Sequence, residues 1–230
     1  MNSETLIALI SIIGIDLVLA GDNAVVIGMA SRNLPDKQRK KAILYGTLAA
    51  VVIRVLLTFI AVQLLEIPLL MAIGGLLLIY VAVKLIAGDE HAEDMESPNS
   101  LLSAIKTIVV ADLIMGLDNI IAIAGASHGN FILILIGLAI SIPIIVFASQ
   151  IISNLMNKYP ILVYIGAAII AYTAAVMLLG DPYVHAFIPV EYHFLLKLII
   201  PVLVLAFGRW KNQKNKNKNK NDELPKRNVG

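Results

Sequence analysis

The chain has 230 residues, of which 59% are hydrophobic and only 15% charged, and its formal net charge is +2. With a mean hydropathy of +0.85, this balance excludes an ordinary soluble domain and indicates an integral membrane protein. The absence of cysteine excludes a disulfide framework and a thiolate metal site.

Seven segments are predicted to cross the membrane, because a hydrocarbon core of about 30 Å takes roughly 17 to 25 helical residues. The first segment is too long for a signal-peptide core and follows no Lys or Arg, so we expect it to be retained. Pro143 and Pro201 fall within spans, where neighbouring helices tolerate a kink. We predict an all-α transmembrane domain over residues 1–208. The seven spans lie near residues 6–30, 42–64, 67–87, 101–126, 131–153, 160–180 and 194–208.

Two polar stretches lie outside the predicted spans. In residues 209–230 Lys and Asn alternate, which predicts a disordered basic tail that touches anionic lipid rather than nucleic acid. Residues 89–96 are rich in Asp and Glu. We interpret this loop as a solvated linker, with the gathering of cations as the alternative.

The basic residues fall in alternate connections. The first connection carries five, from Arg32 to Lys41, the second and fourth carry none, and the tail carries many more. Lys197 is the only basic residue predicted on the other side. Because short cytoplasmic loops hold an excess of Lys and Arg, we predict an outside N-terminus and a cytoplasmic C-terminus.

One eight-residue motif occurs twice inside apolar runs. The first copy is Asp-Leu-Val-Leu-Ala-Gly-Asp-Asn, from Asp16 to Asn23. The second, 96 positions later, is Asp-Leu-Ile-Met-Gly-Leu-Asp-Asn, from Asp112 to Asn119. A carboxylate at the centre of a bilayer costs roughly 2.5 to 3.5 kcal/mol, so acids there indicate function. We take the four Asp residues of the two copies as the candidate site.

The duplication extends to the helices that follow. Residues from Ile73 to Tyr80 resemble those from Ile165 to Tyr172, at an offset of 92. Each repeat, about 6–87 and about 101–180, would then hold three spans, with a seventh helix at about 194–208. An odd number of spans inverts the second repeat relative to the first. This plan is typical of secondary transporters, whose sites lie at the midplane between the repeats.

The spacing within a motif leaves two possibilities. Residues six apart on a helix are displaced by about 240°, so Asp16 and Asp22 do not share a face, whereas Asp16 and Asn23 nearly do. Either one acid per helix points at the site, or the helix is interrupted. Gly21 and Gly116 would permit an interruption that frees backbone carbonyls for a cation. Alternatively, the second Asp of each copy only caps a half-helix.

The ligand chemistry favours a hard cation. Carboxylates, amide oxygens and carbonyls suit magnesium, calcium or manganese. His91, His128, His185 and His193 all fall in predicted loops, so we expect no zinc, copper or nickel site in the membrane. Met115 could add a thioether that favours manganese over calcium, although a Met in a membrane helix is more often a packing residue.

Arg54 is the one basic residue deep in a predicted span, and the second repeat has no counterpart. A lone Arg at this depth normally needs an acidic partner. We therefore expect Arg54 to neutralise one of the site Asp residues. The alternative is an Arg that snorkels to the membrane surface.

The paired Gly-Asp-Asn and Leu-Asp-Asn motifs, on the first and fourth of seven spans, resemble the TerC family of membrane proteins in the wider LysE-like transporter group. The resemblance covers about residues 6–208. Family members of this short bacterial type are linked to manganese export, and some relatives to calcium or manganese exchange for protons. The resemblance thus implies a bacterial plasma membrane protein with a divalent metal ion as its substrate. The positions it implies for the metal are Asp16, Asp22, Asn23, Asp112, Asp118 and Asn119.

These observations predict a secondary transporter that exports manganese by proton antiport. Moving each charge against the membrane potential costs about 2.3 kcal/mol per 100 mV, and no Gly-rich nucleotide loop is present to use ATP. Close carboxylates repel, so one of them would take up a proton when the metal leaves. Sodium coupling, calcium–proton exchange and a non-transporting accessory subunit of a membrane or secretion complex are the alternatives.

No sequence feature indicates an enzyme or a bound cofactor. A retinal protein would need a Lys near the middle of the last helix, whereas Lys197 lies near its outer end. The sequence leaves the oligomeric state open.

Overall fold

The computed structural model describes residues 3–58, 67–87, 98–126 and 130–222. Within these ranges the side chains of residues 3–5, 18–19, 98–99, 117–118, 120–126 and 216–222 are not described. Over the described residues the chain is helical and contains no strand, which confirms the all-α prediction. The helices are α1 (Ser3–Leu19), α2 (Gly21–Ser31), α3 (Asp36–Thr58), α5 (Leu70–Ala87), α6 (Pro98–Ala126), α7 (Phe131–Lys158), α8 (Ile161–Gly180), α9 (Pro182–Phe187) and α10 (Val190–Asp222).

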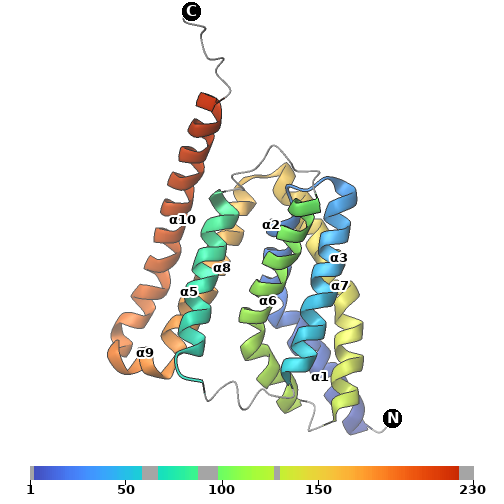
Figure 1. The fold of residues 1–230 in the computed structure, drawn as a ribbon. Coiled ribbons are helices and arrows are strands. Elements are labelled where there is room, and N and C mark those ends of the chain that lie inside the picture. The colour runs from blue at the N-terminus through green and yellow to red at the C-terminus, as the bar shows by residue number, and fades with distance from the viewer. Residues whose placement is uncertain (1–2, 59–66, 88–97, 127–129, 223–230) are drawn as a thin grey trace, which may run out of the picture.

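The long helices stand side by side in a bundle, with the start of α1 at one end and the last turns of α10 beyond the other (Figure 1). Among the described residues, five helices are long and apolar enough to cross a membrane, namely α3, α5, α7, α8 and α10. The bent pair of α1 and α2 would make a sixth. α6 has 29 residues, some of whose side chains are not described. The predicted total of seven spans stays a prediction.

Two predicted boundaries are wrong. The connection expected between residues 180 and 194 holds α9 and the start of α10, so His185 and His193 lie in helices rather than in loops. Asp181 begins α9 by accepting a hydrogen bond from the Tyr183 backbone N–H. At the other end, α10 continues to Asp222, so residues 209–222 are helical where a disordered tail was predicted. His91 and His128 lie outside the described residues.

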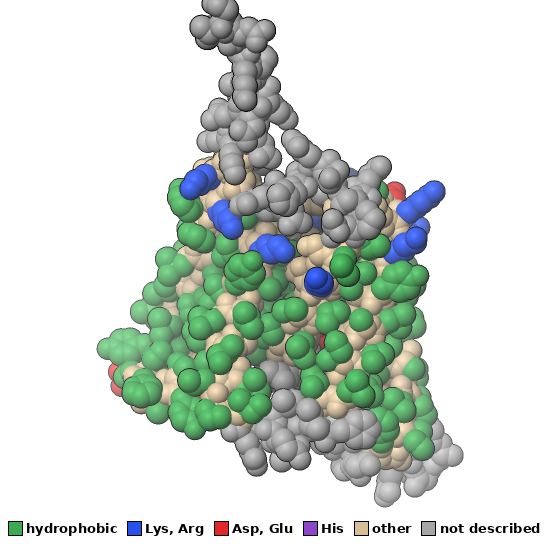
Figure 2. All heavy atoms as spheres, viewed as in Figure 1, with side chains coloured by type: hydrophobic (Ala, Val, Ile, Leu, Met, Phe, Trp, Pro, Cys, Tyr) green, Lys and Arg blue, Asp and Glu red, His purple; other side chains and the backbone are tan. Residues whose placement is uncertain are grey.

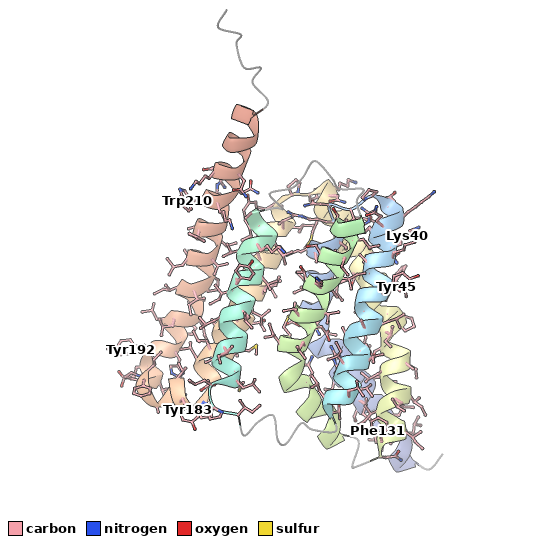
Figure 3. The ribbon with its side chains drawn as sticks, in the orientation of Figure 1. Lys40, Tyr45, Phe131, Tyr183, Tyr192 and Trp210 are labelled. Atoms are coloured by element: carbon pink, nitrogen blue, oxygen red, sulfur yellow. The ribbon has the colours of Figure 1, made fainter. Side chains whose placement is uncertain are left out.

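The surface suits a bilayer. Hydrophobic side chains cover the middle of the bundle, and Lys and Arg gather at the end from which the C-terminal helix projects, here called the basic end (Figure 2). Aromatic residues lie toward both ends, with Tyr183, Tyr192 and Phe131 near one and Trp210 near the other (Figure 3). Aromatic side chains are enriched at the two surfaces of a membrane, so the apolar middle corresponds to the bilayer core.

The packing brings each motif-bearing helix against the second helix of the other predicted repeat. α3 packs on α6, and α7 packs on α1 and α2. Both contacts depend on a glycine. A Cβ added at Gly46 of α3 would lie 2.9 Å from Ile108 of α6, and one at Gly137 of α7 would lie 2.5 Å from Ile12 of α1. Because no side chain intervenes, the backbones approach closely at both places.

These two contacts determine where the site lies. Ile12 and Ile108 each precede the first Asp of a motif copy by four residues, which is about one helical turn. Both isoleucines are fully buried. The close approach of the helices therefore lies directly beside Asp16 and Asp112.

Candidate metal site around Arg54

Arg54 on α3 joins the two copies of the motif. Its Nη1 donates to Oδ1 of Asp16 on α1 at 2.6 Å, and its Nη2 donates to Oδ1 of Asp112 on α6, also at 2.6 Å. Asp16 is 1% exposed, Arg54 4% and Asp112 7%. The prediction that Arg54 pairs with a site Asp is confirmed, and among the described residues it has two acidic partners.

The cluster lies deep in the bundle. Asp112 is the central residue of α6, and Asp16 lies next to the centre of the stretch that α1 and α2 form together. Arg54 lies two turns beyond Gly46 on α3, on the side of that helix that packs against α6. The two motifs therefore meet through these two Asp residues, as predicted, and the position of the site at the middle of the membrane stays a prediction.

Two further side chains complete what we call the carboxylate cluster: Arg54, Asp16, Asp112, Asn23 and Ser141. Asn23 of α2 donates from Nδ2 to Oδ1 of Asp112 at 3.1 Å. Ser141 of α7 donates its hydroxyl to Oδ2 of Asp16. Asn23 is 2% exposed and Ser141 is fully buried, so helices from both repeats enclose the cluster.

The cluster keeps oxygens that no protein group uses. Oδ2 of Asp112 and Oδ1 of Asn23 are buried and have no hydrogen-bond partner among the described residues. A buried polar atom left unpaired costs about 1 to 3 kcal/mol, so such atoms indicate a missing ligand or solvent molecule. Both are hard oxygen donors of the kind that bind manganese, magnesium or calcium.

The formal charge of the cluster is negative. Two carboxylates and one guanidinium sum to −2 + 1 = −1 when all are ionised. A divalent cation placed beside them would reverse that sign unless Arg54 moved away. Among the described residues, no group of three or more His, Cys, Asp or Glu side chains lies close enough to hold a metal ion. The described part of the site thus consists of two carboxylates, an amide and the guanidinium.

Asp22 is held apart from Arg54. It lies in the first turn of α2, where its Oδ1 accepts the Asn23 backbone N–H at 2.9 Å. Its Oδ2 accepts the hydroxyl of Thr173 on α8 at 3.2 Å. The N-cap of α2 is Ala20, and no side chain caps this helix, so the capping alternative is wrong for Asp22, which also forms no ion pair among the described residues. As a metal ligand it stays a prediction.

The predicted interruption occurs in one motif copy only. α1 ends at Leu19 and α2 begins at Gly21, with a bend of 43° between them. α6 runs without a break through Gly116, so the interruption expected there is wrong. A Cβ added at Gly116 would lie 3.6 Å from Nε of Arg54, and the glycine instead leaves room for the guanidinium.

The remaining predicted residues of the second copy lie near the cluster in sequence. Asn119 is 4% exposed, and its Nδ2 has no hydrogen-bond partner among the described residues. Met115 packs in an apolar cluster with residues of α5 and α8, so the structure places it as a packing residue. The side chain of Asp118 lies outside the described residues.

Sequence reasoning missed Ser141 and Thr173. Serine and threonine in a membrane helix usually bond to a carbonyl of their own helix, as Ser149 does with Ile145. A sequence does not reveal which of these hydroxyls also bond to a side chain on another helix. For Ser141 the only signal is its place near Pro143, in the middle of a very apolar run.

A small polar recess of about 40 Å³ lies between α2, α5 and α6 toward the basic end. Its lining includes Asn33, Ser103 and Thr107. Thr107 precedes Asp112 by five residues, which corresponds to about 7.5 Å along α6. The same five residues turn the helix by about 500°, so Thr107 and Asp112 do not share a face of α6.

Comparison with known proteins identifies relatives over nearly the whole chain. Residues 1–217 match the family described as "Integral membrane protein TerC family". The uncharacterized membrane protein YjbE of Bacillus subtilis (strain 168) is 47% identical over 207 residues, which is 90% of this chain and 94% of YjbE. YkoY of the same organism is 26% identical, covering 77% of this chain and 64% of YkoY.

A more distant relative comes from another bacterium. The UPF0053 inner membrane protein YgdQ of Escherichia coli (strain K12) is 24% identical, covering 87% of this chain and 91% of YgdQ. No solved structure matches.

Proposed function

Because the chain belongs to the TerC family of integral membrane proteins, we propose that it is a secondary transporter that exports divalent manganese from the cytoplasm in exchange for protons. One observation carries the proposal: two carboxylates, one from each copy of the motif, meet in a buried cluster within apolar helices. Ionised side chains in a membrane core are costly and mark ion pathways. Asp16, Asp112 and Asn23 are the ligands we propose first.

The packing supports an inverted repeat. Gly46 against Ile108 and Gly137 against Ile12 are corresponding contacts, since each sets the second helix of one repeat against the first helix of the other. A site between two such repeats can be exposed to either side of the membrane when one repeat rocks against the other. This is the arrangement that alternating access requires.

The distribution of charge supports the predicted orientation. Most Lys and Arg side chains in view lie at the basic end (Figure 2). Since positively charged residues are retained in the cytoplasm, we assign the basic end and the C-terminus to that side of a bacterial plasma membrane.

Proton coupling follows from energetics. A divalent cation that leaves an inside-negative cell works against about 4.6 kcal/mol per 100 mV, twice the cost for one charge. When the cation has left, Asp16, Asp112 and Arg54 together keep a formal charge of −1, and a proton taken up by one carboxylate would neutralise it. Inward proton flow would then drive manganese out.

Calcium–proton exchange is the second candidate. The structure places Met115, the only soft ligand predicted, in an apolar cluster. The described ligands are therefore all hard oxygens, which calcium also accepts.

Cellular metal content tests the proposal. A strain lacking the protein should hold more manganese, measured by mass spectrometry of washed cells, and the wild-type gene should restore the normal amount. Asp16→Asn and Asp112→Asn should fail to restore it. Both variants should still insert, because Arg54 retains one carboxylate partner in each. Full restoration by both variants would contradict the site assignment.

A further inference from the structure

We propose that Arg54 is a tethered cation that occupies the site in the ion-free protein and must leave Asp16 and Asp112 before a divalent ion binds there. The inference rests on the proposed function and adds a role for Arg54 in it. Its basis is the pair of 2.6 Å contacts from the two guanidinium nitrogens to Oδ1 of the two carboxylates.

Docked Arg54 and a bound metal exclude each other. A divalent cation held by Asp16 and Asp112, at about 2.0 to 2.6 Å from their oxygens, would bind the same two carboxylate groups that Arg54 contacts. The guanidinium already takes one oxygen of each carboxylate, and its positive charge would lie within a few ångströms of the metal. In a buried, weakly screened site this repulsion is strong.

The surroundings are not those of a completed ion pair. A buried ion pair is favourable when further hydrogen bonds satisfy its remaining atoms. Here Oδ2 of Asp112, Oδ1 of Asn23 and Nε of Arg54 are all buried and have no partner among the described residues. The cluster thus offers more oxygen ligands than the guanidinium uses.

The neighbour of Arg54 on one side is a glycine. Gly116 faces its Nε, and even an added Cβ there would remain at 3.6 Å, an ordinary van der Waals distance. An alanine therefore fits at this position, whereas a larger side chain would extend toward the guanidinium. We infer that Arg54 swings away when a cation enters and returns when it leaves.

This exchange has a consequence for transport. Two buried carboxylates without a cation would be costly, so an empty site needs a positive charge to remain folded in the membrane. Arg54 supplies that charge from within the protein. By returning to Asp16 and Asp112, it competes with the metal and promotes its release.

Metal binding to purified full-length protein tests the inference. Wild type, Arg54→Gln and the control Arg32→Gln would be titrated with Mn²⁺ by calorimetry in detergent. Arg32 donates to the backbone oxygen of Leu85 and has no carboxylate partner among the described residues, so its variant loses the same charge outside the site. Arg54→Gln should bind Mn²⁺ more tightly than wild type, and Arg32→Gln should bind as wild type does.

The expected change is large. If Arg54 leaves the carboxylates in a minor state of about 0.1 to 10% of molecules, its removal should lower the Kd about 10- to 1,000-fold. Mn²⁺ flux through Arg54→Gln in liposomes should fall, because release slows. If Arg54 only holds the fold together, Arg54→Gln should instead raise the Kd for Mn²⁺, because a damaged site holds Mn²⁺ more weakly.

Arg54→Lys keeps the inference testable if Arg54→Gln does not fold. A lysine ammonium is a point charge without the two arms of a guanidinium, so it cannot hold both carboxylates in the same way. This variant should bind Mn²⁺ more tightly than wild type, by a smaller factor. A wild-type protein that neither binds nor moves Mn²⁺ or Ca²⁺ would contradict the proposed function. Wild-type binding with no tightening in the folded Arg54 variant would overturn the role of Arg54 alone.

Discussion

Asn23, in the first copy of the motif, donates a hydrogen bond of 3.1 Å to Asp112, in the second copy. The contact joins residues 89 positions apart and leaves the amide oxygen of Asn23 free inside the cluster. It therefore orients a carboxylate and offers a ligand at once. Groups that orient metal ligands typically change metal affinity by 10- to 100-fold when removed.

Replacement of Asn23 should consequently weaken metal binding. We expect Asn23→Ala to raise the Kd for Mn²⁺ by about 10- to 100-fold, measured by calorimetry on purified protein. Asn157→Ala is the matched control, because Asn157 donates only to the backbone oxygen of Arg32 at an exposed position. Equal affinities in Asn23→Ala and Asn157→Ala would remove Asn23 from the site.

Ser141 gives a second test of the cluster. Its hydroxyl donates to Asp16, and a hydrogen bond to a charged group contributes about 1.5 to 3 kcal/mol. Ser141→Ala should therefore lower the melting temperature in detergent and reduce Mn²⁺ flux. Ser149→Ala should change both less, because Ser149 bonds only to a carbonyl of its own helix. The assignment fails if Ser149→Ala is the more damaging of the two.

Gly137 tests the close packing beside Asp16. A Cβ there would lie 2.5 Å from Ile12, so Gly137→Ala should push α7 from α1 and cost about 1 to 3 kcal/mol of stability. Gly14→Ala is the control on α1, since a Cβ there meets nothing within 4 Å. Thermal unfolding of the two variants should show a clear loss for Gly137→Ala only. Equal melting temperatures would argue against this helix contact.

Asp22→Asn tests whether Asp22 is a metal ligand or serves only to stabilise the fold through its hydrogen bonds. Asparagine keeps one oxygen to accept the Asn23 backbone N–H, and its NH2 group can donate to the Thr173 hydroxyl oxygen in place of the bond that Asp22 accepts, so the fold and melting temperature should be retained. If Asp22 is a metal ligand, loss of its charge should reduce Mn²⁺ flux. We expect that reduction. Unchanged flux would remove Asp22 from the metal ligands and leave it with its hydrogen bonds to Asn23 and Thr173.

The sequence predicted the centre of the site because charge is conspicuous in apolar sequence. Asp16 and Asp112 were identified by their duplication, and Arg54 by its isolation within a span. Each carries a burial cost large enough to need a partner, so their meeting could be expected. The geometry of the contact between Arg54 and the two Asp residues could not be predicted, because it depends on how closely Gly46 and Gly137 let the helices approach.

Other features left no such signal. Gly21 and Gly116 look alike in sequence, yet only the helix at Gly21 breaks, because one glycine costs a helix only about 1 kcal/mol and packing decides the outcome. α9 was missed because six residues between two prolines resemble a loop. The polar end of α10 extends an existing helix, which needs no new nucleation.

Manganese flux in liposomes containing only the purified protein tests the central proposal most directly. With Mn²⁺ inside, the voltage clamped and the outside made acidic, the wild type should release Mn²⁺ faster than it does without a pH gradient. Asp112→Asn should release none above protein-free liposomes. Wild-type flux that persists in Asp112→Asn, or no flux of Mn²⁺ or Ca²⁺ from the wild type under any gradient, would contradict transport through the Asp16–Asp112 site.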